Sequence, residues 1–186
     1  MTRLITQDKF SIDKKERIKI DYNKTAEFYN SRYKEIQYEK YRIAFSSPYI
    51  SINPNSKILD LGCGTGLLFD FLKERNLYPD TVGIDISKEM LKISNGEKIL
   101  GDVENLPFKN NSFDIVFSFT VIQNLPTLKI LEEVSRVLKP NSIFAFTVLK
   151  KKSPSTLPKK LAENNFVILK KFDCCEDEGF VCRNEK

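Results

Sequence analysis

The sequence predicts a doubly wound α/β fold, in which helices cover both faces of a mostly parallel sheet. Three observations lead to it. Short apolar runs alternate with amphipathic helical patterns over most of the chain. A glycine-rich loop, residues 62–66, follows the first apolar run and opens a helix. The tail departs from this alternation and holds two apolar runs on either side of a short turn, which makes that pair of strands antiparallel.

The alternation places each element in order. Helices are expected over 67–76, 88–94 and 128–139, where Ser87 supplies an N-cap for the second and Pro140 with Asn141 ends the third. Amphipathic spacing fits the third helix, because Leu128, Leu131 and Val134 share one stripe. The strands alternate with these helices, and we expect them over residues 57–61, 81–85, 97–102, 113–120 and 142–149.

The two ends of the chain differ from the centre. Residues 156–165 are helix-like, and two further strands, 166–172 and 180–184, flank an acidic turn over 173–179. Near the start, residues 25–45 predict a helix. That helix offers apolar and aromatic surface through Phe28, Tyr29, Tyr33, Ile36 and Tyr41.

Composition limits the classes of protein to consider. The 186 residues are enough for one core, and a chain with 41% apolar and 30% charged residues is typical of a globular protein. We expect no membrane span, and the first residues lack the apolar core of a signal peptide, so a cytoplasmic location is predicted. The chain has four cysteines, no CxxC pattern and no histidine, so we expect reduced thiols and no metal site.

The net charge of +5 is modest and comes mostly from lysine. Lysine and arginine are concentrated in two segments, residues 9–19 and 150–160. If the fold brought these segments together, they could bind a phosphate backbone. The charge alone is weak evidence for nucleic acid.

The glycine loop predicts a ligand site. Glycine permits tight turns and close approach of a ligand to the backbone, and the following helix start offers free N–H groups. The order Gly62, Gly64, Gly66 is GxGxG, whereas dinucleotide sites favour GxGxxG. Asp85, at the end of the next strand, is suited to accept hydrogen bonds from both hydroxyls of a ribose. Asp102, at the tip of the third strand, could accept from an adenine amine.

At this point the sequence resembles a known family. The segments ILDLGCGTG, GIDIS, GDVENLPF, FDIVFSFTVIQNL and LEEVSRVLKPNSIFAFT, in this order, are similar to the class I S-adenosylmethionine-dependent methyltransferases, in particular the type 11 group. The resemblance covers about residues 55–150. It implies a Rossmann-like seven-stranded sheet in the order 3-2-1-4-5-7-6 with strand 7 antiparallel. The pattern along the chain itself predicts one domain, with a helical extension over 1–50, a core over 55–150 and a helix with a hairpin over 151–186. The resemblance implies that the extension is a cap and that the core binds the cofactor.

The resemblance implies the cofactor S-adenosylmethionine and assigns residues to it. Asp60 and the loop Gly62, Cys63, Gly64 and Gly66 would hold the methionine portion, although Cys63 can equally be a small packing residue. Asp85 would bind the ribose and Ile86 the adenine face. Asp102 and the Val103 amide would bind the adenine edge. Phe119 and Thr120 would line the floor between cofactor and acceptor.

Catalytic chemistry is constrained by what the chain lacks. A base is needed only if the acceptor atom loses a proton, and without histidine imidazole catalysis is excluded. Gln123 and Asn124 are therefore expected to orient the acceptor through their amides, with Tyr29 on the capping helix as a further positioning residue. Aromatic packing is an equally good interpretation of Tyr29.

Three functions stay open at this stage. A methyltransferase acting on a small molecule is the leading hypothesis. An RNA base methyltransferase is the second, because TVIQNL resembles the VIQWL stretch of the eukaryotic small-subunit rRNA guanine-N7 enzymes and the lysine segments could bind phosphate. A non-catalytic cofactor-binding partner protein is the third. The sequence does not define the acceptor or a partner subunit.

Overall fold

The computed structural model describes the backbone of residues 2–186 and the side chains of residues 14–186. Its sheet has seven strands in the order β3-β2-β1-β4-β5-β7-β6, which confirms the predicted topology. Neighbouring strands among the first five are parallel, and β7 pairs antiparallel with both β5 and β6. The strands are β1 (Lys57–Leu61), β2 (Asp80–Asp85), β3 (Glu97–Leu100), β4 (Phe113–Phe119), β5 (Leu138–Leu149), β6 (Phe166–Cys174) and β7 (Asp177–Asn184).

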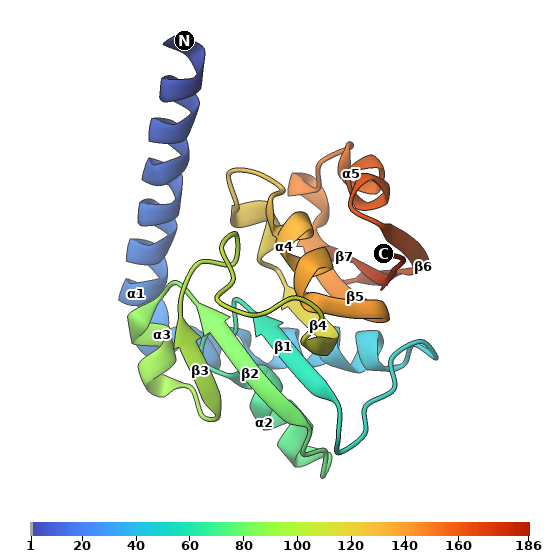
Figure 1. Ribbon diagram of the computed structural model, residues 1–186. Helices are drawn as coiled ribbons and strands as arrows, with labels where there is room; N and C mark the ends of the chain where they lie inside the picture. Colours follow the sequence, from blue (N-terminus) through green and yellow to red (C-terminus); the bar gives the residue numbers. More distant parts are fainter. Residues whose placement is uncertain (1) are drawn as a thin grey trace.

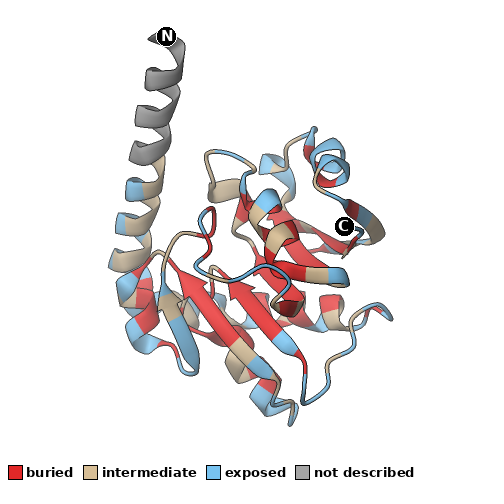
Figure 2. Ribbon diagram, viewed as in Figure 1, coloured by how far each residue is buried: buried red, intermediate tan, exposed pale blue. Residues whose placement is uncertain are grey.

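Helices cover both faces of this sheet (Figure 1). One face packs against side chains of α1 (Thr2–Phe45) and α2 (Leu67–Glu74), and the other against α4 (Ile130–Val137) and α5 (Leu157–Glu163). The remaining helices are α3 (Lys88–Ile93) and two short 3-10 turns, η1 (Ile122–Asn124) and η2 (Lys150–Lys152). The central strands are the most deeply buried part of the molecule (Figure 2). Their carboxyl ends form the edge at which α/β proteins bind ligands.

The C-terminal half of helix α1 packs into the core of the molecule. Tyr38, Tyr41 and Ala44 are buried there, and the Tyr41 ring meets Phe71 and Phe119 edge-on with centroids 5.1 and 4.7 Å apart. Phe28 instead is 67% exposed. The expected aromatic surface of this helix is thus divided, since Tyr41 belongs to the core and Phe28 faces solvent.

Several predicted boundaries were wrong. Helix α1, expected from residue 25, already begins at Thr2, and the third strand, expected to reach residue 102, ends at Leu100. The third central helix ends at Val137, and β5 begins directly at Leu138, so Pro140 and Asn141 lie inside a strand. The carbonyls of Arg136 and Val137 accept from the N–H groups of Asn111 and Ser112. These hydrogen bonds hold the end of α4 beside the start of β4, so the chain enters the sheet at this point. Asn141, at φ 61°, lies in the irregular stretch of β5 that follows the pairing of Leu138 with Phe113.

The hairpin turn is shorter than predicted. The acidic turn was predicted over 173–179, yet β6 continues to Cys174 and β7 starts at Asp177. Only two residues connect them, and Cys175 takes the left-handed conformation with φ 57°. Asp177 is buried, so part of the acidic run belongs to the strand and not to an exposed loop.

Candidate functional site

Three adjoining cavities lie at the carboxyl ends of β1, β2 and β4, under helix α1. The central cavity is lined by residues that include Lys15, Tyr22, Asp85, Asp102 and Asn124. The inner cavity extends from it past the glycine loop and reaches Asp60, Cys63 and Gln37. The outer cavity is bounded by α1, the η1 turn and the β6–β7 hairpin, and it shares Tyr22, Tyr29, Thr120 and Asn124 with the central cavity.

Asp85 joins the glycine loop to helix α3. Its Oδ2 accepts from Gly64 N–H at 2.8 Å and its Oδ1 from Ser87 N–H at 2.7 Å, while Ser87 Oγ caps α3 by accepting from Met90 N–H. Burial raises the pKa of Asp85, and these amide hydrogen bonds counteract part of that rise. Each carboxylate oxygen can still accept a further hydrogen bond, so Asp85 can accept from two ribose hydroxyls.

The loop leaves bare backbone beside these cavities. Gly62 and Cys63 N–H both donate to the Ile84 carbonyl, which fixes the loop onto β2. Gly64 has φ 53° and lines both the central and the inner cavity; a Cβ there would meet no atom nearer than 4.0 Å. The space beside Gly64 is therefore available to a ligand. At Gly66 a Cβ would meet Ser94 Oγ at 2.4 Å, so that glycine serves packing against α3.

Cys63 is a packing residue with its backbone in the loop. Its side chain is 7% exposed, and a Cβ at Gly83 would meet its Sγ at 2.6 Å. Burial, with smaller contributions from nearby Asp60 and Asp85, raises the pKa of the thiol far above its usual value. The thiol is therefore neutral and unreactive at this position.

Asp60 is the acidic group of the inner cavity. Its side chain comes from β1 and is 4% exposed. Burial, together with the neighbouring charge of Asp85, raises its pKa to about 8. A cationic group in this cavity would relieve both effects, so the position suits the ammonium of a bound amino acid.

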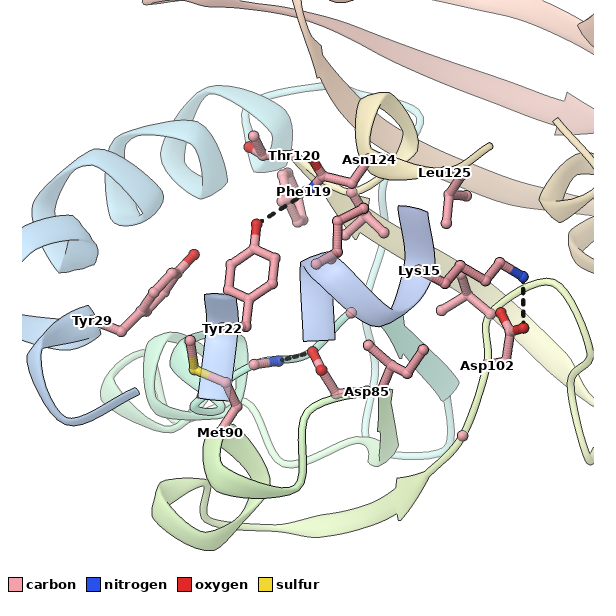
Figure 3. A pocket seen from close by; sticks show the side chains of 17 residues that line it. Lys15, Tyr22, Tyr29, Asp85, Met90, Asp102, Phe119, Thr120, Asn124 and Leu125 are labelled. Carbon is pink, nitrogen blue, oxygen red and sulfur yellow. Dashed lines mark hydrogen bonds and ion pairs between the residues drawn. The ribbon is translucent and has the colours of Figure 1, made fainter. Parts of the chain in front are cut away.

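The long helix α1 reaches across to Asp102, a contact that the sequence analysis missed (Figure 3). The Lys15 ammonium lies 2.6 Å from Asp102 Oδ2 and 2.6 Å from Glu104 Oε2. Burial alone would raise the pKa of Asp102, but the Lys15 ammonium and the Glu104 amide lower it overall. The oxygen expected to bind an adenine amine thus already has a cationic partner.

Two tyrosines of α1 stand between the central and outer cavities. Tyr22 points toward Asn124 (Figure 3), whose Nδ2 donates to its hydroxyl at 3.1 Å. Tyr29 accepts from Gln37 Nε2 at 3.2 Å, and the two rings lie 6.4 Å apart. Sequence analysis singled out Tyr29 but not Tyr22; their spacing of seven, which places both on one helical face, was the available signal.

A buried ion pair closes the far end of the outer cavity. Lys40 Nζ lies 2.9 Å from Asp177 Oδ2, and both side chains are at most 5% exposed. The hydroxyls of Thr120 and Thr147 donate to the same oxygen at 2.8 Å. This network joins α1 to β4, β5 and β7. It was missed because Asp177 was expected in an exposed turn.

Most predicted site residues line these cavities. The central cavity has Tyr29, Gly62, Gly64, Asp85, Ile86, Asp102, Val103, Phe119, Thr120 and Asn124, and the inner cavity adds Asp60 and Cys63. Gln123 lines the outer cavity, where its Nε2 donates to the Thr120 carbonyl. Gly66 lies outside these linings.

The lysine-rich segments are not brought together. The segment around Lys15 lies on α1 and the second on η2 and α5, which are at opposite sides of the view in Figure 1. Lys150 pairs with Asp173, and Lys160 with Glu163. Lys9 lies outside the described side chains. The described lysines therefore do not form one phosphate-binding face.

Comparison with known proteins adds independent findings. Residues 59–146 match a family model described as a methyltransferase domain. The chain is 37% identical over 156 residues to an uncharacterized protein of Methanocaldococcus jannaschii, covering 80% of this chain and 58% of that protein. It is 29% identical to a malonyl-[acyl-carrier protein] O-methyltransferase of Marinomonas sp., over a match that covers 84% of this chain and 60% of that protein. Over 72 residues it is 43% identical to the 18S rRNA (guanine-N(7))-methyltransferase of Bos taurus, a match that covers 36% of this chain and 25% of that protein.

A solved structure extends the likeness to the fold. A chain of the Haloferax volcanii complex between the Trm112 methyltransferase activator and a methyltransferase superposes with a TM-score of 0.75 at 16% identity, covering 91% of this chain and 97% of that one. The chain spans 48% to 60% of the length of the first curated relatives it matches. Within the described residues, no helix combines the length and apolarity needed to cross a membrane.

Proposed function

We propose that this chain, which belongs to the class I S-adenosylmethionine-dependent methyltransferases, transfers the methyl group of that cofactor to a small molecule bound in the outer cavity. One observation carries the proposal. The central and outer cavities share Tyr22, Tyr29, Thr120 and Asn124 as a common wall, so ligands in the two cavities would meet there. Juxtaposition of two reactants is the main requirement of an in-line displacement.

The chain's own residues fit the cofactor in three places. Asp60 in the inner cavity suits the ammonium of the methionine portion, and bare backbone at Gly64 accommodates the chain of that portion. Asp85 retains acceptor capacity for the ribose. Ile86 and Val103 line the central cavity and offer an apolar surface for the adenine ring. When bound, the cofactor supplies a methyl group on a positively charged sulfur.

The protein binds the cofactor and the acceptor, orients them toward each other and excludes water. Phe119 is the last residue of β4, and Thr120 follows it. The Tyr41 ring packs edge-on against Phe119, and Thr120 N–H donates to Thr147 Oγ1. Asn124 is oriented by its hydrogen bond to Tyr22, so its side chain keeps a fixed place beside both cavities. We propose that Asn124, Gln123 and Tyr29 position the acceptor. Helix α1 lies over the central cavity, where it limits the access of water.

A small-molecule acceptor is favoured because the two lysine-rich segments lie apart, and because Lys150, Lys159 and Lys160 pair with acidic residues. The relative named as a malonyl-[acyl-carrier protein] O-methyltransferase is consistent with an acceptor other than nucleic acid. An RNA base is the second candidate, supported by the VIQNL stretch and by the relative that methylates 18S rRNA. A non-catalytic cofactor-binding protein would bind the cofactor without turnover.

Radiolabelled S-adenosylmethionine and a cell extract separated into RNA, protein and small molecules test the proposal. We expect label in the small-molecule fraction with the parent chain and a strong loss of label with Asp85→Ala. Asp80→Ala, at the exposed opposite end of the same strand, is the matched control and should label like the parent. Label in RNA would favour the second candidate. Cofactor binding without label in any fraction would contradict methyl transfer.

A further inference from the structure

Resting on the proposed function, we infer that residues 14–21 of helix α1 form a latch over the adenine end of the cofactor site, and that the cofactor displaces this latch segment when it binds. Lys15 of the segment holds Asp102, the residue assigned to the adenine amine, as Figure 3 shows. Lys15 and Ile18 both line the central cavity, so the chain itself fills part of its cofactor site.

The cavities at the glycine loop are too small for the cofactor while the latch segment is in place. The central cavity measures about 80 Å³ and the adjoining inner cavity about 30 Å³. Cavities that hold ligands of this size usually measure about 300–1,000 Å³. Lys15 lies at the adenine end, against Asp102, so withdrawal of the latch segment enlarges the central cavity where the adenine ring needs space.

Lys15 competes with the adenine amine for the same oxygen. Asp102 Oδ1 accepts from Glu104 N–H at 2.9 Å, and Oδ2 receives Lys15 Nζ at 2.6 Å and Asn105 Nδ2 at 3.4 Å. A carboxylate oxygen accepts about two hydrogen bonds, so Oδ2 has its full set of donors. The adenine amine therefore reaches Oδ2 only after the Lys15 ammonium has left it.

Glu104 makes the closed form the stable one in the absence of cofactor. Its side chain is 4% exposed, and its Oε2 lies 2.6 Å from Lys15 Nζ, while Thr127 Oγ1 donates to its Oε1. Opening of the latch segment removes the Lys15 cation from this buried carboxylate, which opposes opening. Cofactor affinity is then reduced in proportion to the fraction of molecules that are open.

The latch segment is packed less firmly than the rest of α1. None of the side chains of residues 14–21 is buried, whereas Tyr41 and Ala44 lie in the core. Lys14 Nζ donates to the Leu125 carbonyl at 2.7 Å, so a second lysine at the surface of the helix helps to hold the segment. Segments with few buried apolar contacts open at a low cost in free energy.

The attachment of α1 changes directly after the latch segment. Tyr22 accepts from Asn124 Nδ2 at 3.1 Å, and Asn23 Oδ1 accepts from Ser87 Oγ at 2.7 Å. These contacts hold the helix to the η1 turn and to the start of α3. Residues from 22 onward therefore stay in place over the shared wall of the cavities while residues 14–21 move.

Calorimetric titration with S-adenosylhomocysteine tests the competition. We expect Lys15→Met and Glu104→Gln each to bind it about tenfold more tightly than the parent, because each removes one charged contact of the closed form. Glu104→Gln keeps an oxygen for Thr127 and provides the test if Lys15→Met does not fold. Tighter binding by either folded variant supports the latch, and unchanged or weaker binding by both would overturn it.

Lys19→Met is the matched control. Lys19 pairs with Glu16 at 3.4 Å, and both residues belong to the latch segment, so this pair does not connect the segment to the sheet. The variant loses the same charge from the same stretch of helix as Lys15→Met. It should bind S-adenosylhomocysteine like the parent, and a tenfold gain in this variant too would overturn the role of Lys15.

Hydrogen–deuterium exchange of the parent chain tests the displacement without any substitution. At saturating S-adenosylhomocysteine we expect faster exchange of the amides of residues 14–21 and slower exchange of those of the glycine loop, 62–66. Unchanged or slower exchange over 14–21, with a protected loop, would overturn the latch while leaving cofactor binding intact. If no chain, variants included, gives a binding signal in calorimetry and exchange is unchanged everywhere, the proposed function itself fails.

Discussion

The proposed placement of the cofactor depends on Asp85 more than on any other residue. Its two oxygens tie the Gly64 and Ser87 amides together, so the loop and helix α3 share one anchor. We expect Asp85→Ala to weaken S-adenosylhomocysteine binding by about 2 kcal/mol or more, because charge-assisted hydrogen bonds to the ribose are lost. Isothermal titration calorimetry measures this effect. Asp80→Ala is the control, and unchanged affinity in a folded Asp85→Ala chain would refute the pose.

Asp60 makes cofactor binding dependent on pH. Its pKa of about 8 means that the carboxyl is mostly protonated at pH 6, and a ligand ammonium favours the charged form. Binding should therefore release a proton, and affinity should rise by up to about tenfold per pH unit below 8 and level off above it. Calorimetric titrations from pH 6 to 9 measure the slope. Asp60→Asn should bind with a flatter profile; an identical slope in that variant would assign the proton to another group.

Gln123 and Asn124 test the placement of the acceptor. Both line the outer cavity, and their side chains are held by Thr120 and Tyr22 respectively. Once an acceptor is known, Gln123→Ala and Asn124→Ala should lower turnover without abolishing it, with cofactor affinity close to that of the parent. Steady-state kinetics and calorimetry separate the two effects. Full activity in both variants, or a general loss of cofactor binding, would place the acceptor elsewhere.

At the scale of elements, the buried pair Lys40–Asp177 fixes helix α1 to the sheet. Removing one partner of such a pair leaves the other charge uncompensated, which typically costs about 3–5 kcal/mol. We expect Lys40→Met to lower the free energy of unfolding by about that amount in urea denaturation.

The same helix offers a matched control. Lys34 also pairs with an acid, Glu74, but at 3.5 Å and with both side chains more than 40% exposed. Exposed pairs contribute at most about 1 kcal/mol, so Lys34→Met should be nearly neutral. Equal effects of the two variants would mean that burial of Lys40 does not matter for stability.

At the scale of the whole molecule, local patterns predicted the alternation of strands and helices and the antiparallel hairpin, whereas the strand order followed from the resemblance to the methyltransferase family. Strand β1, the glycine loop and the Ser87 cap were predictable from apolar spacing and residue chemistry over a few positions. The contact of Lys15 with Asp102 and that of Lys40 with Asp177 join residues 87 and 137 positions apart. Such pairs depend on how α1 crosses the sheet, which local patterns do not encode. For the same reason, the buried state of Asp177 could not be inferred from an acidic run.

The central claim is that the carboxyl edge of this sheet binds S-adenosylmethionine. The most direct test is calorimetric titration of the parent chain with S-adenosylhomocysteine and, separately, with NAD. The GxGxG loop, the open space at Gly64 and the acidic inner cavity around Asp60 predict saturable binding of S-adenosylhomocysteine and none of NAD. Tight binding of NAD with no response to S-adenosylhomocysteine would contradict the account.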